Sequence, residues 1–213
     1  MQVLLQMFEG VSKRMKKTIL LGALLLSAAA GYAQESRQDV SISASGNFSP
    51  TIHGATGTFT TTNDSLGALA SYRYLLTPRS GLEANYGFTQ NTPVYTVPGT
   101  LVNQVHSRQQ EFSAAYLYTR TYKRYNPFIE GGAGAMFFSP IKDFQTNTLD
   151  LKRTTSIGGV FGTGVAYELT PSFDIRAEYR GFVGKTPNYG DSNFTTNRYR
   201  VLSMPTIGVA YHF

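Results

Sequence analysis

Polar and apolar residues alternate with a period of two in eight segments of about ten residues each. In the second segment, Leu66, Ala68 and Ala70 share one face of an extended chain, while Gly67 and Ser71 lie on the other. This period predicts a β-strand with one apolar face. The segments span residues 40–48, 66–74, 82–89, 111–119, 129–137, 156–168, 173–183 and 206–213. The pattern therefore predicts an all-β fold with an even number of strands.

The connections between these segments alternate between short and long. Short ones cover residues 77–81, 119–126 and 170–172. Long ones are rich in Thr, Asn, Gly and Pro and cover residues 49–64, 91–104, 139–153 and 184–197. Barrels of the bacterial outer membrane have short periplasmic turns and longer extracellular loops. With a periplasmic N-terminus, the long connections are expected on the outside of the cell.

The charged residues indicate which face of the strands points inward. Only 15% of the residues are charged, against about 25% in typical soluble domains. Within the strands, the ionisable residues occupy the polar face: Arg73, Glu83, Glu111, Glu130, Glu168, Asp174, Arg176, Glu178 and Arg180. A soluble sandwich or lipocalin-like barrel would place this face outward. The low charge and the mixture of acids and bases favour a membrane barrel with a polar lumen.

Aromatic residues gather at the strand ends, as in the two aromatic girdles of membrane barrels. The ends near the short turns carry Tyr72, Tyr74, Tyr116, Tyr118, Phe128, Tyr167, Phe173, Tyr211 and Phe213. The ends near the long loops carry Phe48, Phe88, Phe137, Phe182 and Tyr199. These positions predict two membrane–water interfaces.

The N-terminus has the features of a secretory signal peptide. Four basic residues between positions 13 and 17 precede an apolar run over residues 19–30, and Gly31-Tyr32-Ala33 provides a cleavage site. The run is shorter than the roughly 20 residues of a transmembrane helix. We expect cleavage after Ala33, which leaves a barrel at 34–213, and Met15 is an alternative translation start. Cleavage lowers the net charge from +6 to +3, which weakens any nucleic-acid interpretation.

The C-terminal stretch "TIGVAYHF" continues the alternation to the last residue, where most domains fray. Thr206, Gly208, Tyr211 and Phe213 form a polar-x-Gly-x-x-aromatic-x-aromatic pattern that resembles the C-terminal signal of bacterial outer-membrane barrels. The stretch "DIRAEYRG" at 174–181 is similar to the penultimate strand of OmpA/OmpX-type barrels. This resemblance covers residues 38–213 and implies an eight-stranded antiparallel transmembrane β-barrel. It also implies recognition of the tail by the barrel-assembly machinery.

One residue departs from this pattern. Pro205 lies inside the last predicted strand and has no N–H to donate to a neighbour. We therefore expect a β-bulge or an interrupted ladder at this position.

The polar face suggests a network of charges inside the lumen. Its members are Arg73, Glu83, Glu111, Glu130, Arg176, Glu178 and Arg180. An eight-stranded barrel is barely wide enough for its own side chains, so crossing acid–base pairs would close a water path. The alternative is a gated pore with the same residues as its constriction.

No catalytic, metal or cofactor site is predicted. His53, His106 and His212 lie in separate regions without a carboxylate at ligand spacing. His106 and Ser107 are adjacent on a strand and therefore point to opposite faces, so they cannot form the histidine–serine pair of a hydrolase. The glycine clusters at 131–136 and 158–164 do not open a helix and are not phosphate loops.

The sequence therefore predicts a non-catalytic, monomeric barrel of a Gram-negative outer membrane. Its expected role is membrane integrity or surface interaction through four outer loops. The alternatives are a narrow solute channel, similar to a porin, and a lipid A-modifying enzyme. Scattered loop cations could pair with lipopolysaccharide phosphates: Arg108, Lys142, Lys152, Arg153, Lys185 and Arg198. Outer-membrane lipid and the assembly machinery are the other expected partners, and nucleic acid is not one.

Overall fold

The computed structural model describes residues 37–53, 59–96, 103–142, 151–191 and 194–213. Gln38–His212 form one compact unit. The predicted signal peptide 1–33, its cleavage at Ala33 and the alternative start at Met15 lie outside the described residues. They remain predictions.

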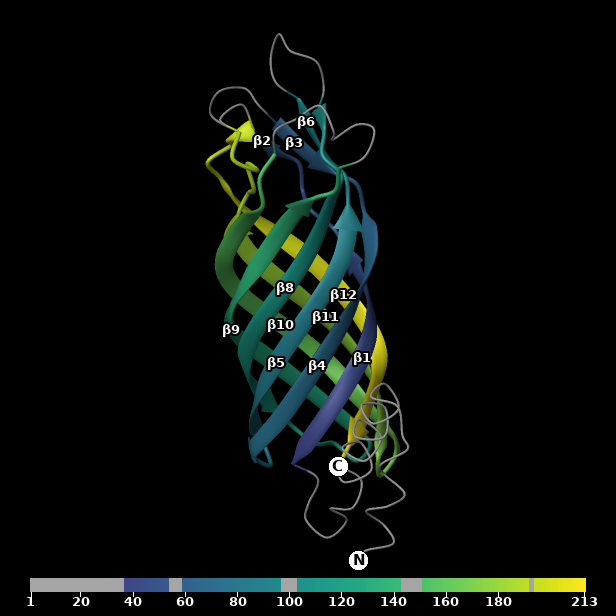
Figure 1. Cartoon of the computed structure of the whole chain (residues 1–213). Helices are drawn as coiled ribbons and strands as arrows, with labels where there is room; N and C mark the ends of the chain where they lie inside the picture. Colours follow the sequence, from purple (N-terminus) through teal and green to yellow (C-terminus); the bar gives the residue numbers. More distant parts are fainter. Residues whose placement is uncertain (1–36, 54–58, 97–102, 143–150, 192–193) are drawn as a thin grey trace, which may run out of the picture. The chain divides into compact units, whose positions relative to one another are not determined.

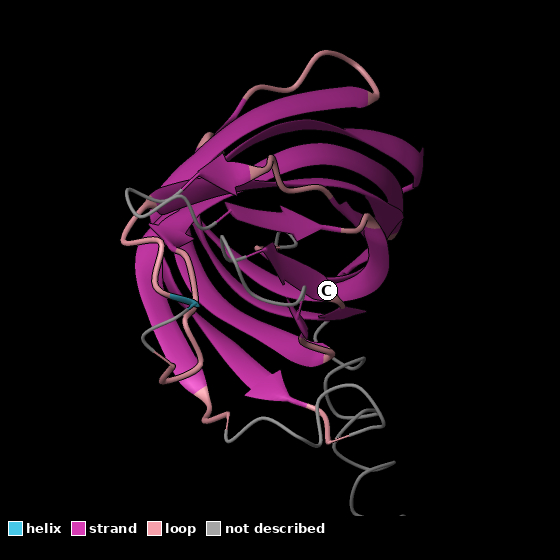
Figure 2. Ribbon diagram, turned by 90° about the horizontal axis from the view of Figure 1, so that it is seen from above, coloured by secondary structure: helices cyan, strands magenta, loops and turns pink. Residues whose placement is uncertain are grey.

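Eight antiparallel strands close into a barrel, which confirms the predicted fold class (Figures 1 and 2). Each strand pairs with the next along the chain, and the last pairs with the first. In order they are β1 (Gln38–Asn47), β4 (Ser65–Thr77), β5 (Ser80–Asn91), β8 (Ser107–Thr119), β9 (Tyr125–Pro140), β10 (Thr154–Thr170), β11 (Phe173–Lys185) and β12 (Tyr199–His212). Among the described residues, no helix is long and apolar enough to cross a membrane.

A small second sheet was not predicted from the sequence. It consists of β2 (Ile52–His53), β3 (Phe59–Thr62), β6 (Pro93–Thr96) and β7 (Asn103–Gln104), and it lies beyond the long-loop end of the barrel (Figure 1). These strands have two to four residues each, too few to show a period in the sequence. Two of the long connections are therefore folded caps of the barrel.

The two faces of the strands are oriented as predicted. Ile42, Leu66 and Ile157 point outward and are 75–84% exposed, as expected for side chains that contact lipid. The polar residues that alternate with them are buried in the lumen. Two aromatic assignments were wrong, because Phe128 and Phe182 are each 2% exposed and lie inside. Their position in the alternation places them on the same face as Glu130 and Arg180, and this alternation outweighs their location near a strand end.

Pro205 interrupts the ladder on one side only. Pairing of β12 with β11 continues through Pro205 without a register shift. On the other side, pairing with β1 ends at Ser45–Thr206 and resumes at Phe48–Ser203. The Ser203 N–H points toward β1 and donates to Phe48 O at 2.8 Å. N–H groups two residues apart in a strand point the same way, so the N–H that Pro205 lacks would also have faced β1. The predicted interruption is confirmed there, and no bulge forms.

Gly208 lies where β12 approaches β1 closely. A Cβ atom at Gly208 would collide with the carbonyl oxygen of Ile42 and the side chain of Ser43. Tyr211, on the outward face, packs against Phe173 with a ring-centroid distance of 5.1 Å. Gly208 therefore has a role in the folded barrel that is independent of any recognition of the C-terminal pattern.

We predict that Gly208→Val disrupts the β1–β12 seam even without assembly machinery. Overpacking of a tight site costs about 1–3 kcal/mol. The purified protein should refold poorly in detergent, measured as the fraction that migrates as a folded band without boiling. Gly131→Val is the matched control, because a Cβ at Gly131 meets nothing within 4 Å. Equal refolding of the two variants would contradict the role of close approach.

Deletion of Phe213 tests the assembly signal separately. We expect the truncated protein to reach the outer membrane at reduced levels in cells, because the terminal aromatic residue of the pattern is lost. The same protein should refold in detergent to a normal extent, since no machinery is involved there. Normal surface levels in cells would contradict the predicted signal.

Candidate functional site: the sealed lumen

Side chains of opposite charge cross the middle of the barrel and form what we call the ionic belt. Its members are Asp39, Arg73, Glu83, Glu111, Glu130, Arg176, Glu178 and Arg180, all at most 6% exposed. All seven residues predicted for the lumen network are among them. Asp39 was missed, although it shares a face with Ser41 and Ser43, so the period-two pattern could have revealed it.

One half of the belt joins β1, β4, β5 and β11. Arg73 binds Glu83 through its Nη2 and Nε atoms at 2.5 and 2.7 Å. Arg176 Nη2 donates to Asp39 Oδ1 at 2.8 Å, and its Nη1 lies 3.7 Å from Glu83 Oε2. The ring of Phe128 lies beneath both guanidinium groups, 4.6 Å from Arg73 Cζ and 5.8 Å from Arg176 Cζ. Phe128 therefore supports the two cations by cation–π contact.

The other half is centred on Arg180, whose side chain is fully buried. Its Nε atom lies 3.0 Å from Glu130 Oε1 and 3.2 Å from Glu178 Oε1, and its Nη2 lies 3.3 Å from Glu111 Oε1. Because Arg has a planar fork of donors, one residue can bind carboxylates from several strands at once. Arg180 thus links β8, β9 and β11.

Asn85 connects the two halves. With its amide oriented so that both ends find partners, its nitrogen donates to Glu83 Oε1 at 2.9 Å. In the same orientation, its oxygen accepts from Arg180 Nη2 at 3.2 Å. The belt is therefore one continuous network around the lumen.

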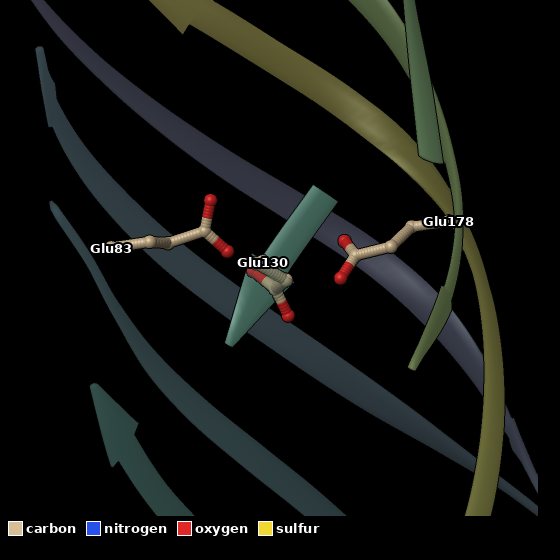
Figure 3. A group of neighbouring side chains, drawn as sticks. All are labelled: Glu83, Glu130 and Glu178. Carbon is tan, nitrogen blue, oxygen red and sulfur yellow. The ribbon is translucent and has the colours of Figure 1, made fainter. Parts of the chain in front are cut away.

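Glu83, Glu130 and Glu178 point toward one another from β5, β9 and β11 (Figure 3). One carboxylate oxygen from each lies within 4.8 Å of the others, so this is a place where oxygen ligands for a cation gather. Each of the three also contacts a guanidinium of the belt. We therefore interpret the group as part of the ionic belt, and the sequence prediction that the chain has no metal site remains untested.

His212 differs from its sequence-based description. The sequence shows no carboxylate at metal-ligand spacing from any histidine, but in the structure His212 Nε2 lies 2.9 Å from Asp174 Oδ2 on the neighbouring strand. The two residues are 38 positions apart, and only the register of β11 against β12 brings them together. The pair lies at the short-turn end of the polar lumen.

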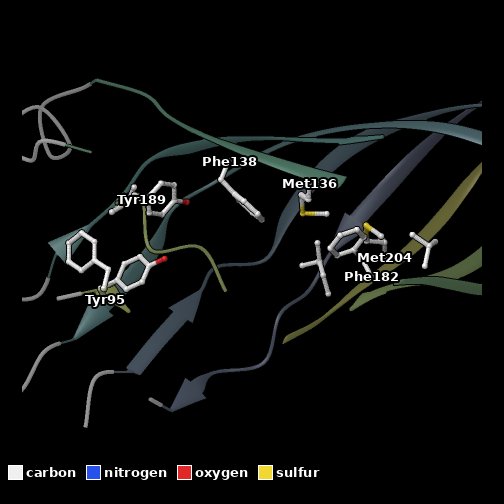
Figure 4. Close-up of a cluster of buried hydrophobic side chains, with 10 residues drawn as sticks. Tyr95, Met136, Phe138, Phe182, Tyr189 and Met204 are labelled. Carbon is white, nitrogen blue, oxygen red and sulfur yellow. The ribbon is translucent and has the colours of Figure 1, made fainter. Parts of the chain in front are cut away.

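An apolar layer fills the lumen between the ionic belt and the long loops, and we call it the apolar plug. Figure 4 shows Met136, Phe182 and Met204 deep in this cluster, with Tyr95 and Tyr189 at its far end. Its remaining members are Val105, Phe138, Val160, Phe194 and Leu202. Sequence reasoning missed the plug because three of its five aromatic residues come from the long connections, where no period-two pattern marks a buried face.

Residues from the small sheet and from the last long connection complete the plug. Tyr95 of β6 stacks on Phe194 at 4.6 Å and meets Tyr189 edge-on at 6.3 Å. The Tyr95 hydroxyl donates to Pro187 O at 2.9 Å. Burial raises the pKa of Tyr189 to about 12, so its hydroxyl stays neutral at physiological pH. Tyr189 has a φ of +52°, an unusual backbone conformation that the surrounding contacts maintain.

The space between the two layers is small. A cavity of about 20 Å³ is lined by Arg180 and Gln109 on the polar side and by Met136 and Met204 on the apolar side. This volume suits about one water molecule. The ionic belt and the apolar plug therefore follow one another along the lumen, with this small cavity where they meet.

A closed barrel with apolar side chains outside and paired charges inside is the arrangement of a transmembrane β-barrel. Residues 18–213 match the outer membrane protein beta-barrel domain, and the chain belongs to that family. This match places the protein in the outer membrane with its relatives. No curated protein sequence matches the chain significantly.

Three solved outer-membrane proteins share the fold. OprG from Pseudomonas aeruginosa is 13% identical, with 84% of this chain and 97% of OprG covered and a TM-score of 0.63. Neisserial surface protein A is 19% identical, with 84% and 98% covered and a TM-score of 0.56. Ail of Yersinia pestis, in complex with the heparin analogue sucrose octasulfate, is 15% identical, with 83% and 99% covered and a TM-score of 0.50.

We predict that Arg180→Ala strongly destabilises the barrel. Removal of one partner from a buried ion network leaves uncompensated charge and costs about 3–5 kcal/mol. The free energy of unfolding can be measured by urea titration in detergent, with the heat-sensitive gel shift as the readout of folding. Lys185→Ala is the control, because Lys185 lies exposed on the same strand. Equal urea midpoints for the two variants would show that Arg180 does not hold the belt together.

Proposed function

We propose that this protein is a non-catalytic outer-membrane barrel whose closed body anchors a binding surface formed by the long connections. The proposal rests on the two layers of side chains that fill the lumen, the ionic belt and the apolar plug. A conducting pore needs a continuous aqueous path, whereas here the ionic belt is followed directly by the apolar plug. The surface left for interaction is the long-loop end with its small sheet.

Lipopolysaccharide is the partner that the charge of this surface favours. Lys152, Arg153 and Arg198 are exposed near the long-loop end and could bind phosphate groups. The structural relative Ail was solved with a sulfated ligand, which is consistent with polyanion binding by a barrel of this fold. The likeness to Ail concerns the fold alone.

Lipid A modification has no support from the residues considered for it. Ser107 is fully buried, and its hydroxyl lies 3.5 Å from Asn91 Oδ1. A hydrolase would need an accessible nucleophile next to its base. Mass analysis of lipid A from cells with and without the gene tests this alternative, and an altered acyl pattern would overturn the proposal of a non-catalytic role.

Conductance in planar bilayers tests the closed lumen against the narrow channel. We expect no resolved openings for the unaltered protein. Arg180→Ala should raise the conductance by opening the ionic belt, and the double change Arg180→Ala/Phe182→Ala should raise it further because it also thins the apolar plug. Each variant is first shown to be folded by its gel shift before heating.

Lys185→Ala serves as the matched control for insertion and should remain closed. Regular openings of the unaltered protein would favour the channel and contradict the proposal. Unchanged closure of the folded double variant would show that the two layers do not seal the lumen.

A further inference from the structure

Two neighbouring short turns carry four exposed cations, which we call the basic turn cluster. Arg79 lies in the β4–β5 turn, and Arg120, Lys123 and Arg124 lie in the β8–β9 turn. The Thr119 N–H donates to Arg79 O at 2.9 Å and joins the two turns. Among the described residues, none of the four cations is within 4.0 Å of a carboxylate oxygen.

The position of Arg120 is fixed by tyrosine hydroxyls. Its Nε atom donates to Tyr118 Oη at 3.3 Å, and a further hydrogen bond joins it to Tyr122. These two bonds raise the pKa of Arg120 above its ordinary value. The guanidinium is therefore charged and hydrogen-bonded to Tyr118 at the end of β8, although no acidic residue requires it there.

The backbone of the β8–β9 turn is tight. Tyr122 and Tyr125 exchange two backbone hydrogen bonds, of 2.7 and 2.9 Å. Lys123 within this turn has a φ of +55°, a region where glycine or asparagine costs less. The chain thus carries a cation at a position whose backbone conformation disfavours it.

The depth of the cluster matches that of lipid headgroups. Tyr116 and Tyr118 face outward just before the β8–β9 turn, and Tyr125 packs on Tyr167 just after it with a centroid distance of 5.0 Å. Tyrosine rings prefer the membrane–water interface. The cations follow these rings by only a few residues and therefore lie at the level of the lipid phosphates.

We propose that the basic turn cluster binds the phosphate groups of anionic phospholipids in the leaflet beside the short turns. The four cations supply the positive charge, and the hydrogen bond to Tyr118 orients the guanidinium of Arg120. The neighbouring tyrosines place the cluster at the level of the lipid headgroups. Each Lys or Arg near the membrane surface favours binding to anionic lipid over neutral lipid by about fivefold. The cluster would give this barrel a specific lipid contact at the end opposite its long loops.

Lipid retention measures this preference. The mature protein is placed in nanodiscs of equal phosphatidylglycerol and phosphatidylcholine, and the lipids that remain bound after mild detergent release are identified by native mass spectrometry. We expect the unaltered protein to retain phosphatidylglycerol preferentially. The triple variant Arg120→Gln/Lys123→Gln/Arg124→Gln should lose this enrichment by about tenfold or more, consistent with the preference expected for each cation.

The triple change Lys152→Gln/Arg153→Gln/Arg198→Gln is the matched control, since it removes the same charge at the long-loop end. A transmembrane strand needs about 9–11 residues, and the adjoining strands β10 and β12 have 17 and 14. These cations are therefore expected beyond the headgroups of the nanodisc phospholipids, where only the larger head group of lipopolysaccharide would reach them. The control should change the enrichment by less than about twofold, below the effect of a single cation at the membrane surface.

Tyr118→Phe tests whether the orientation of Arg120 matters. This change keeps every charge and the aromatic ring but removes the acceptor of the Arg120 hydrogen bond. We expect a loss of about two- to threefold, less than that of a missing cation. Equal enrichment in the folded triple variant and the unaltered protein would overturn the proposal. An equal loss in both triple variants would also overturn it, because it would show a general effect of net charge.

Discussion

The contacts of Arg180 with Glu111, Glu130 and Glu178 are the interaction on which the barrel interior depends. An eight-stranded barrel must fill its lumen with side chains, and in this chain those of the middle layer are charged. Burial of such charges is tolerated only where each is paired and hydrogen-bonded. Arg180 pairs with carboxylates from three strands and hydrogen-bonds to Glu111 and Glu130, and Asn85 extends the network to the half that contains Arg73 and Arg176. The strands are therefore fixed to one another across the lumen as well as along their backbone ladders.

The apolar plug closes the lumen by a different physical principle. Its side chains exclude water mainly through apolar packing, to which the hydrogen bond from Tyr95 to Pro187 O is added. The two layers therefore respond differently to substitution: loss of one charge in the belt leaves other charges unpaired, while loss of one ring in the plug leaves a cavity. Because the two layers follow one another along the lumen, a change in one of them should open the lumen less than changes in both.

The period-two pattern was sufficient to predict the strands and the direction of their faces. It placed Arg73, Glu83 and Arg180 in the lumen because alternation depends only on neighbouring residues. It could not assign Arg180 to its partners, since these depend on the registers of several strand pairs. Phe128 and Phe182 were assigned to the girdles because aromatic type was given more weight than their place in the alternation. The apolar plug was missed because Tyr95 and Tyr189 come from connections whose folding depends on contacts far apart in sequence.

The C-terminal pattern has two physical origins that the sequence alone does not separate. Because β12 pairs with β1, the barrel closes between its first and last strands. Gly208 is required at this seam by the proximity of Ile42, and Thr206 is buried on the lumen face. The glycine therefore follows from the folded structure, whatever reads the tail. Tyr211 lies on the outward face, where its contact with Phe173 could be made by other apolar residues. The aromatic positions of the pattern, more than Gly208, are thus where recognition of the tail should be sought.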